Sequence, residues 1–238
     1  MSSFARGLIE ESRTIHPFLH HPLYHDIWAG KLSPDQVRVV VRQQGAFSLD
    51  TIRHGALRLA HAGGTFPTRE ELELQRALIP TIVEEAGQDT VGGTQTAHPL
   101  LFVRFAGALG IAEDDLFHTS YLPEIVIEKS ELFALQVAST LEALCGGAIA
   151  TEAINHEHSG RMAEAYQRHY HVSEHDVAFY AVHAGGIEEE HGARGVEIVD
   201  RLIRDDSDRD RARLAMLRAI AARRTAADAM YRAIQPSN

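Results

Sequence analysis

The sequence has very little cysteine, no cluster of basic residues and no long apolar run. A single cysteine, Cys145, in 238 residues excludes a disulfide framework and a thiolate-rich zinc site. The net charge of −10 comes without the grouped Lys and Arg of a nucleic-acid-binding surface. The N-terminal MSSFARGLIEESRT lacks the apolar core of a signal peptide, and no apolar stretch is long enough to span a bilayer. We therefore expect a soluble, cytoplasmic protein.

Helix signals dominate what is present. Ser33 and Gln36 form a capping-box pattern, which predicts a helix that runs to the paired glycines at 63–64. Thr68 caps the next helix, which ends at Gly87. Further helical segments are 98–111, 122–147, 148–170, 173–205 and 208–234. No linker interrupts them, so residues 1–238 are predicted to form one all-α domain, a bundle of about seven helices.

The segment VHAGGIEEEHG combines two of the fifteen histidines with three glutamates and a Gly-Gly pair. In a regular α-helix His183 and His191 would point roughly 80° apart, and His183 and Glu188 roughly 140° apart. A π-bulge at Gly185-Gly186 would absorb one residue and bring all three side chains together. The alternative is a solvated helix face that carries two surface histidines.

Other helices offer further metal ligands of the same kind. Glu85 lies near the end of one predicted helix, and His98 begins the next one. Glu152 lies in a run of small apolar residues, where a carboxylate is expected to be buried and therefore to need a partner. His156 and His158 follow it, and we interpret them as surface histidines beyond the site.

The order of these motifs resembles a known superfamily. Glu-x-Gly, His-Pro-Leu-Leu-Phe, Thr-Glu, Phe-Tyr-x-x-His and Glu-x-x-His-Gly follow one another as in the haem-oxygenase-like di-iron oxidases. The same superfamily includes the pyrroloquinoline quinone synthase PqqC and the TenA thiaminases, whose opening is similar to residues 20–47. The likeness covers roughly residues 14–205.

The resemblance implies a haem-oxygenase-like bundle that binds two Fe(II) ions and uses O₂ as co-substrate. Carried over position by position, it implies six iron ligands: Glu85, His98, Glu152, His183, Glu188 and His191. Glu85 and Glu152 are also the expected catalytic residues. Two departures stand out. The family usually has Asp in place of Glu188, and its last two histidines are usually seven residues apart, not eight. Without the bulge, the second iron would lose a ligand.

The reactions that the resemblance implies are N-oxygenation, oxidative C–C cleavage and desaturation, often in natural-product biosynthesis. We expect a small substrate derived from an amino acid, because the candidate pocket residues are mixed in polarity. Arg53, Gln44 and Tyr180 are the expected substrate contacts, with Arg53 able to pair with a carboxylate. Further candidates for the pocket wall are Arg42, Gln43, Tyr121, Lys129 and Tyr170.

Two other functions stay open at this point. One is a cofactor-independent enzyme of the PqqC or TenA kind, although nothing in the sequence around Cys145 indicates an activated thiolate. The other is a non-enzymatic helical binding protein that uses its acidic surface. A homodimer is expected from the resemblance alone.

Overall fold

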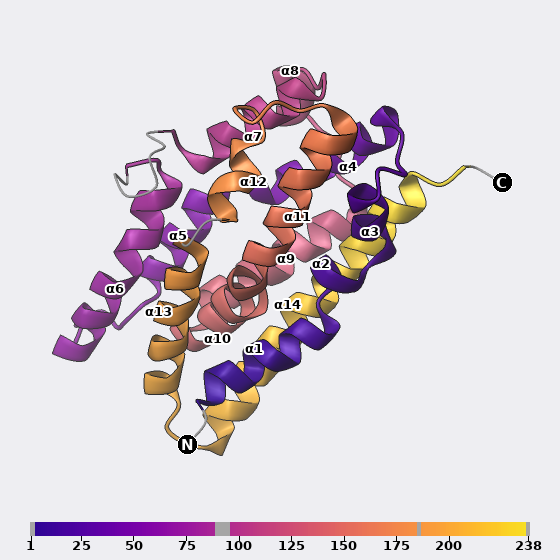
Figure 1. Ribbon diagram of the computed structural model, residues 1–238. Helices are drawn as coiled ribbons and strands as arrows, with labels where there is room; N and C mark the ends of the chain where they lie inside the picture. The colour runs from indigo at the N-terminus through magenta and orange to yellow at the C-terminus, as the bar shows by residue number, and fades with distance from the viewer. Residues whose placement is uncertain (1–2, 89–95, 185–186, 237–238) are drawn as a thin grey trace.

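The chain folds almost entirely into helices in the computed structural model, which describes residues 3–88, 96–184 and 187–236 (Figure 1). The helices in chain order are α1 (Phe4–Ile15), α2 (Pro17–His20), α3 (Pro22–Trp28), α4 (Pro34–Ser48), α5 (Thr51–Ala60), α6 (Arg69–Glu85), α7 (His98–Ala108), α8 (Glu113–Phe117), α9 (Pro123–Ala138), α10 (Thr140–Leu144), the π-helix η1 (Cys145–Glu152), α11 (Ala153–Tyr170), α12 (Ala178–His183), α13 (Ile187–Leu202) and α14 (Asp206–Ala233). The described residues contain no strand, so the all-α prediction is confirmed.

Side-chain caps fix where several helices begin. Ser33 and Thr68 each accept a hydrogen bond from the backbone N–H three residues on, and both predicted helix starts are confirmed, each as a full capping box. Two buried histidines serve the same purpose before prolines. The Nδ1 atoms of His16 and His21 accept from the backbone N–H two residues on, at the starts of α2 and α3. Part of the high histidine content is thus structural.

Three helices predicted as continuous are divided in the structure. The first divides after Ser48, and Asp50 then precedes α5. The segment 122–147 divides at Ser139, which is extended and places its hydroxyl over the start of α10. The segment 173–205 becomes α12, which ends at His183, and α13, which starts at Ile187. The first two predicted lengths were wrong because helical periodicity continues across the breaks at Ser48 and Ser139.

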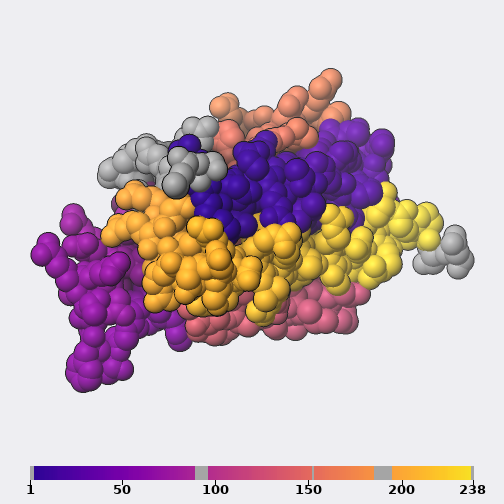
Figure 2. Space-filling view, turned by 90° about the horizontal axis from the view of Figure 1, so that it is seen from below, coloured from indigo at the N-terminus to yellow at the C-terminus, as the bar shows by residue number. Residues whose placement is uncertain are grey.

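The long helix α14 organises one side of the molecule. It packs along α9 and η1 and also contacts α1 (Figure 1). One buried cluster surrounds Phe102, Phe105 and Tyr166, and a second one surrounds Leu135 and Ile149. The segment that contains α6, purple in Figure 2, projects at one end of the face shown there. Among the described helices, none combines the length and apolar character that a membrane span requires.

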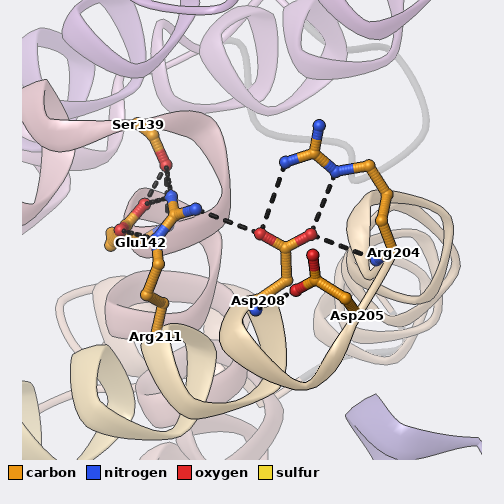
Figure 3. A network of polar contacts seen from close by, with 6 residues as sticks. All are labelled: Ser139, Glu142, Arg204, Asp205, Asp208 and Arg211. Atoms are coloured by element: carbon orange, nitrogen blue, oxygen red, sulfur yellow. Dashed lines mark hydrogen bonds and ion pairs between the residues drawn. The ribbon is translucent and has the colours of Figure 1, made fainter.

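A polar network joins the start of α14 to the start of α10 (Figure 3). Asp208 accepts hydrogen bonds from Arg204 Nε at 3.0 Å and from Arg211 Nη1 at 3.0 Å. Arg211 also reaches both carboxylate oxygens of Glu142, at 2.8 Å and 3.0 Å. The network fixes the helix that leads directly into η1. We call it the α10–α14 junction.

Candidate metal centre and adjoining cavity

Three of the predicted ligands meet at one point of the bundle. Glu85 is the last residue of α6, His98 is the first of α7 and His183 is the last of α12. Glu85 Oε2 lies 3.2 Å from His98 Nδ1, and Glu85 Oε1 lies 4.0 Å from His183 Nε2. One ligand atom from each residue lies within 4.8 Å of the others. Three helix ends therefore converge on a space the size of a metal ion.

Backbone geometry explains how Glu85 and His98 meet across a long connection. Gly87 has φ +68°, a conformation that favours glycine. A Cβ atom at this position would lie 2.3 Å from the carbonyl carbon of Thr96, so only glycine allows the chain to return this closely. Pro99 then stands in the first turn of α7. The two helix ends are therefore held side by side.

Neighbouring groups orient the ligand atoms. Thr51 Oγ1 donates a hydrogen bond to Glu85 Oε2 at 2.6 Å. His183 Nδ1 lies 2.6 Å from the carbonyl oxygen of Phe179, which assigns the proton to Nδ1. His183 Nε2, on the side of Glu85, is then left with a lone pair. A histidine ligand held by a carbonyl group in this way is typical of protein metal sites.

Burial and charge shape the carboxylate of Glu85. Burial alone raises the pKa of this carboxyl, but His98, His183 and the Thr51 hydroxyl outweigh burial and hold the pKa at about 2. His98 Nδ1 is fully buried and makes no well-directed hydrogen bond with any described residue, although Glu85 is close. A buried, unsatisfied ring nitrogen beside an ionised carboxylate fits a metal ligand.

The other three predicted ligands lie outside the described side chains. Glu152 is the last residue of η1, and Glu188 and His191 lie in the first turns of α13. The predicted bulge at Gly185-Gly186 also lies outside the described residues. A π-helix is nevertheless present in the described part of the chain, at Cys145–Glu152, where the sequence analysis did not place one. π-Helical segments are frequent at functional sites.

We call the meeting point of Glu85, His98 and His183 the metal corner. A cavity of about 230 Å³ opens beside it. Its lining includes Glu85 and His183 together with aromatic, amide and charged side chains from several helices. Of the predicted contacts, Gln44 and Tyr180 both line it, and the Tyr180 hydroxyl donates to Gln44 Oε1 at 3.3 Å. Gln43 lines it as well. Gln43, Gln44 and Tyr180 thus lie in the cavity wall, as expected.

Arg53 is not part of the cavity wall. Its side chain is 60% exposed, pairs with Asp50 at 3.3 Å and lies over the ring of Phe133. In this part of the chain Arg58, five residues on, is the arginine of α5 that is buried and lines the cavity, with its Nε donating to Gln136 at 3.1 Å. The remaining wall candidates are absent from the lining: Arg42, Tyr121, Lys129 and Tyr170.

The interpretation of His158 as a surface residue is wrong. His158 is 3% exposed, lines the cavity and stacks on Phe18 with ring centroids 4.3 Å apart. Burial lowers the pKa of His158 to about 3, so the ring is neutral at ordinary pH. His156 is partly buried. The cover over His158 comes from α2 and α3, which helical periodicity within α11 cannot reveal.

Two buried charged residues of the cavity gave no signal in the sequence. Glu128 of α9 and Arg223 of α14 are both buried and form an ion pair with an N–O distance of 3.2 Å. Burial raises the pKa of Glu128, against the opposing effect of Arg223.

Cys145 is also buried, and burial raises the pKa of its thiol to about 12. The only cysteine is therefore not an activated nucleophile.

A carboxylate and two imidazoles are donors that non-haem transition-metal sites in helical bundles use. The chain belongs to a family of iron-containing redox enzymes, whose model matches residues 51–224. All six residues predicted as ligands fall within the matched part. A search of curated proteins found no match.

Solved structures with the same fold support this assignment of architecture. A TenA homologue from Pseudomonas syringae pv. tomato is 18% identical, with a TM-score of 0.78 over 96% of this chain and 93% of that one. A CADD-like protein of unknown function from Nostoc punctiforme is 15% identical, with a TM-score of 0.75 over 97% and 96%. A domain of unknown function with a heme oxygenase-like fold from Shewanella denitrificans is 14% identical, with a TM-score of 0.73 over 96% and 90%. At these identities the likeness concerns the fold alone. The predicted haem-oxygenase-like bundle is confirmed.

Proposed function

We propose that the protein is a non-haem di-iron oxidase or oxygenase that uses O₂ to oxidise a small substrate derived from an amino acid. The observation that carries this proposal is the corner formed by Glu85, His98 and His183, of which Glu85 and His183 line the cavity. Membership of a family of iron-containing redox enzymes supports the choice of metal.

The donor set suits iron. One carboxylate and two imidazoles are hard and borderline donors, and the single cysteine is buried and protonated. Glu85, His98 and His183 would hold one ion in this arrangement. The second ion would draw on residues that the resemblance implies: Glu152, Glu188 and His191. Bound ferrous iron would supply the electrons that reduce O₂.

The chain's own residues prepare the space in which a substrate would react. Phe179 and Tyr180 place aromatic surface beside His183, which keeps bulk water away from the corner. Gln44, fixed by the Tyr180 hydroxyl, offers an amide to a polar substrate group. TenA-type hydrolysis through a cysteine nucleophile is not supported, because the Cys145 thiol is buried and protonated.

Iron loading tests this proposal directly. Protein incubated anaerobically with Fe(II) and then desalted should retain about two irons per chain, measured by elemental analysis. His183→Ala and Glu85→Ala should lower the affinity for iron by about a hundredfold or more, because each removes a direct ligand. His175→Ala is the matched control, since its side chain is 73% exposed and precedes α12. Equal iron retention by all four proteins would refute the metal site.

The second iron and the reaction need separate measurements. Glu152→Ala should reduce iron retention to about one per chain and abolish the change in near-UV absorption that follows addition of O₂. Iron retention at the wild-type level would remove Glu152 from the ligand set. Absence of O₂ consumption with any pool of amino-acid derivatives would favour a binding protein instead. Homodimerisation stays a prediction that size-exclusion chromatography can check.

A further inference from the structure

One guanidinium is held rigidly in the cavity wall. The Arg223 side chain lies between the rings of Phe47 and Phe18, with its central carbon 4.8 Å and 5.3 Å from their centroids. Its Nε donates to Thr151 at 3.1 Å, and its Nη1 donates to Glu128 at 3.2 Å. Two ring faces and two hydrogen bonds therefore fix its orientation before any ligand arrives.

This ion pair is incomplete. Both side chains are 10% exposed, yet only one oxygen of Glu128 and two nitrogens of Arg223 have hydrogen-bond partners among the described residues. Glu128 Oε2 and Arg223 Nη2 are left over, and neither is among the fully enclosed atoms. Both residues line the cavity. A largely buried charged residue that lines a cavity and has a spare hydrogen-bonding atom points to a ligand that supplies the missing bond.

We propose that Arg223 and Glu128 together bind the head group of an α-amino-acid substrate, with its carboxylate on Arg223 and its ammonium group on Glu128. This inference rests on the proposed function for the identity of the site. A simple anion would be repelled by Glu128, and a simple cation would be repelled by Arg223. A zwitterion satisfies both spare atoms, and each bond would be charge-assisted.

The placement of the pair fits a substrate that spans the cavity. Arg223 and Glu128 come from α14 and α9, while Glu85 and His183 come from α6 and α12. All four residues line the same cavity. A substrate anchored by its head group would leave its side chain free to extend toward the metal corner. The pair would thus act as a specificity determinant rather than as a catalytic group.

Calorimetry with matched ligands tests the proposal. The full chain, both metal-free and loaded anaerobically with Fe(II), is titrated with each of the twenty common α-amino acids. For every binder, the amine that lacks the carboxylate, the acid that lacks the amino group and the primary amide are titrated as well. Removing either charge should weaken binding by about tenfold to a hundredfold. Binding by none of the twenty, or equal binding of the deaminated acid, would overturn the proposal, and preference for the amide would show a neutral head group instead.

Variants assign the effect to the pair. Glu128→Gln keeps the shape and a bond to Arg223 but removes the charge, so it should abolish the preference for the amino acid over the deaminated acid. Arg223→Lys should weaken the amino acid and the deaminated acid alike and leave the amine unchanged. The control pair is Arg218 and Glu131, on the same two helices and more exposed, with an N–O distance of 2.5 Å. Glu131→Gln and Arg218→Lys should bind every ligand as the wild type does.

The result separates this inference from the proposed function. If Glu128→Gln retains iron normally but loses no ligand preference, the head-group site is wrong and the metal site stands. If no variant or wild-type protein retains iron while amino acids still bind through the pair, the oxidase proposal is wrong and the head-group site stands. A merely structural role of Glu128 would weaken all ligands equally, which also overturns the inference.

Discussion

The helix α14 carries two arginine–carboxylate assemblies that differ in how completely they are bonded. At the α10–α14 junction, both oxygens of Asp208 accept from Arg204 or Arg211, and both oxygens of Glu142 accept from Arg211. In the cavity, Arg223 and Glu128 share one hydrogen bond. The first assembly leaves no carboxylate oxygen for a ligand, whereas the second retains an acceptor and a donor.

This difference separates structural polar groups from groups able to bind. The carboxylates at the junction have all their partners within the protein, next to the Ser139 and Asp205 caps that begin α10 and α14. In the cavity, Arg223 and Glu128 are largely buried although not all their polar atoms have partners. This lowers the stability of the folded state unless a ligand or water supplies the missing hydrogen bonds. Experiments that act on one region and spare the other measure how well this distinction holds.

Acid should destabilise the cavity before the junction, and this is the largest effect expected from comparing the two regions. Burial lowers the pKa of His158 to about 3, below its value in the unfolded chain. As the pH falls through about 6.5, the unfolded chain takes up a proton that the folded chain refuses, so stability is lost. Between pH values of about 6.5 and 5 the loss should be about 2 kcal/mol for this residue. Urea unfolding at the two pH values measures it.

His158→Gln should remove that part of the acid sensitivity, since glutamine can still donate to the carbonyl oxygen of Phe18 and does not titrate. His175→Gln, at an exposed position, should leave the acid sensitivity as it is in the wild type. Asp208 responds in a different pH range. Hydrogen bonds from Arg204 hold the pKa of Asp208 below its ordinary value, so its contribution is lost only as the pH falls below about 3.8. If His158→Gln loses as much stability as the wild type between pH values of about 6.5 and 5, His158 is not the source of the acid sensitivity.

Removing the hydroxyl that orients Glu85 should have a smaller effect, visible in metal affinity. Thr51→Val keeps the shape of the side chain but removes the bond to Glu85 Oε2. The affinity for Fe(II) should fall by about tenfold, because a group that orients a ligand typically contributes this much. Thr51→Ser should retain the affinity. Thr225→Val, which removes an exposed hydroxyl bonded to its own helix, is the control. An unchanged affinity in Thr51→Val would show that Thr51 does not support the corner.

The smallest effect on the metal site is expected from the junction. Asp208→Asn removes the charge that Arg204 and Arg211 share at a buried position, and it should lower the melting temperature at neutral pH. Iron retention and amino-acid binding should not change, because the junction has no part in the cavity lining. High salt should reduce the difference between variant and wild type. A change in iron affinity would instead couple the junction to the metal corner.

The sequence predicted the elements that local chemistry determines. Ser33 and Thr68 begin their helices as expected, because a cap depends on residues three positions apart. Glu85, His98 and His183 were found through the order of short motifs, and the structure brings them together. The resemblance to the haem-oxygenase-like di-iron oxidases supplied this set, because the three residues lie on three separate helices and no spacing within one helix relates them.

What the sequence could not predict depends on contacts between distant segments. Arg223 meets Thr151 and Glu128 across 72 and 95 residues of chain, and its helix contains several similar arginines that face solvent. The exposed Arg53 and the buried Arg58 differ in packing, which residue type alone does not reveal. The break at Ser139 is different, because it carries a local signal that was missed: the Ser139 side chain accepts from the Glu142 N–H three residues on and caps α10.

The π-helix Cys145–Glu152 has a consequence for how this fold can change over generations. A π-helical turn accommodates one residue more than an α-helical turn, so deleting one residue here would let an α-helix form without interruption. The residues on either side would keep their directions, whereas those inside the segment, Thr151 among them, would take new ones. A change of length at this point would therefore remodel one stretch of the cavity wall and leave the rest of the bundle in register.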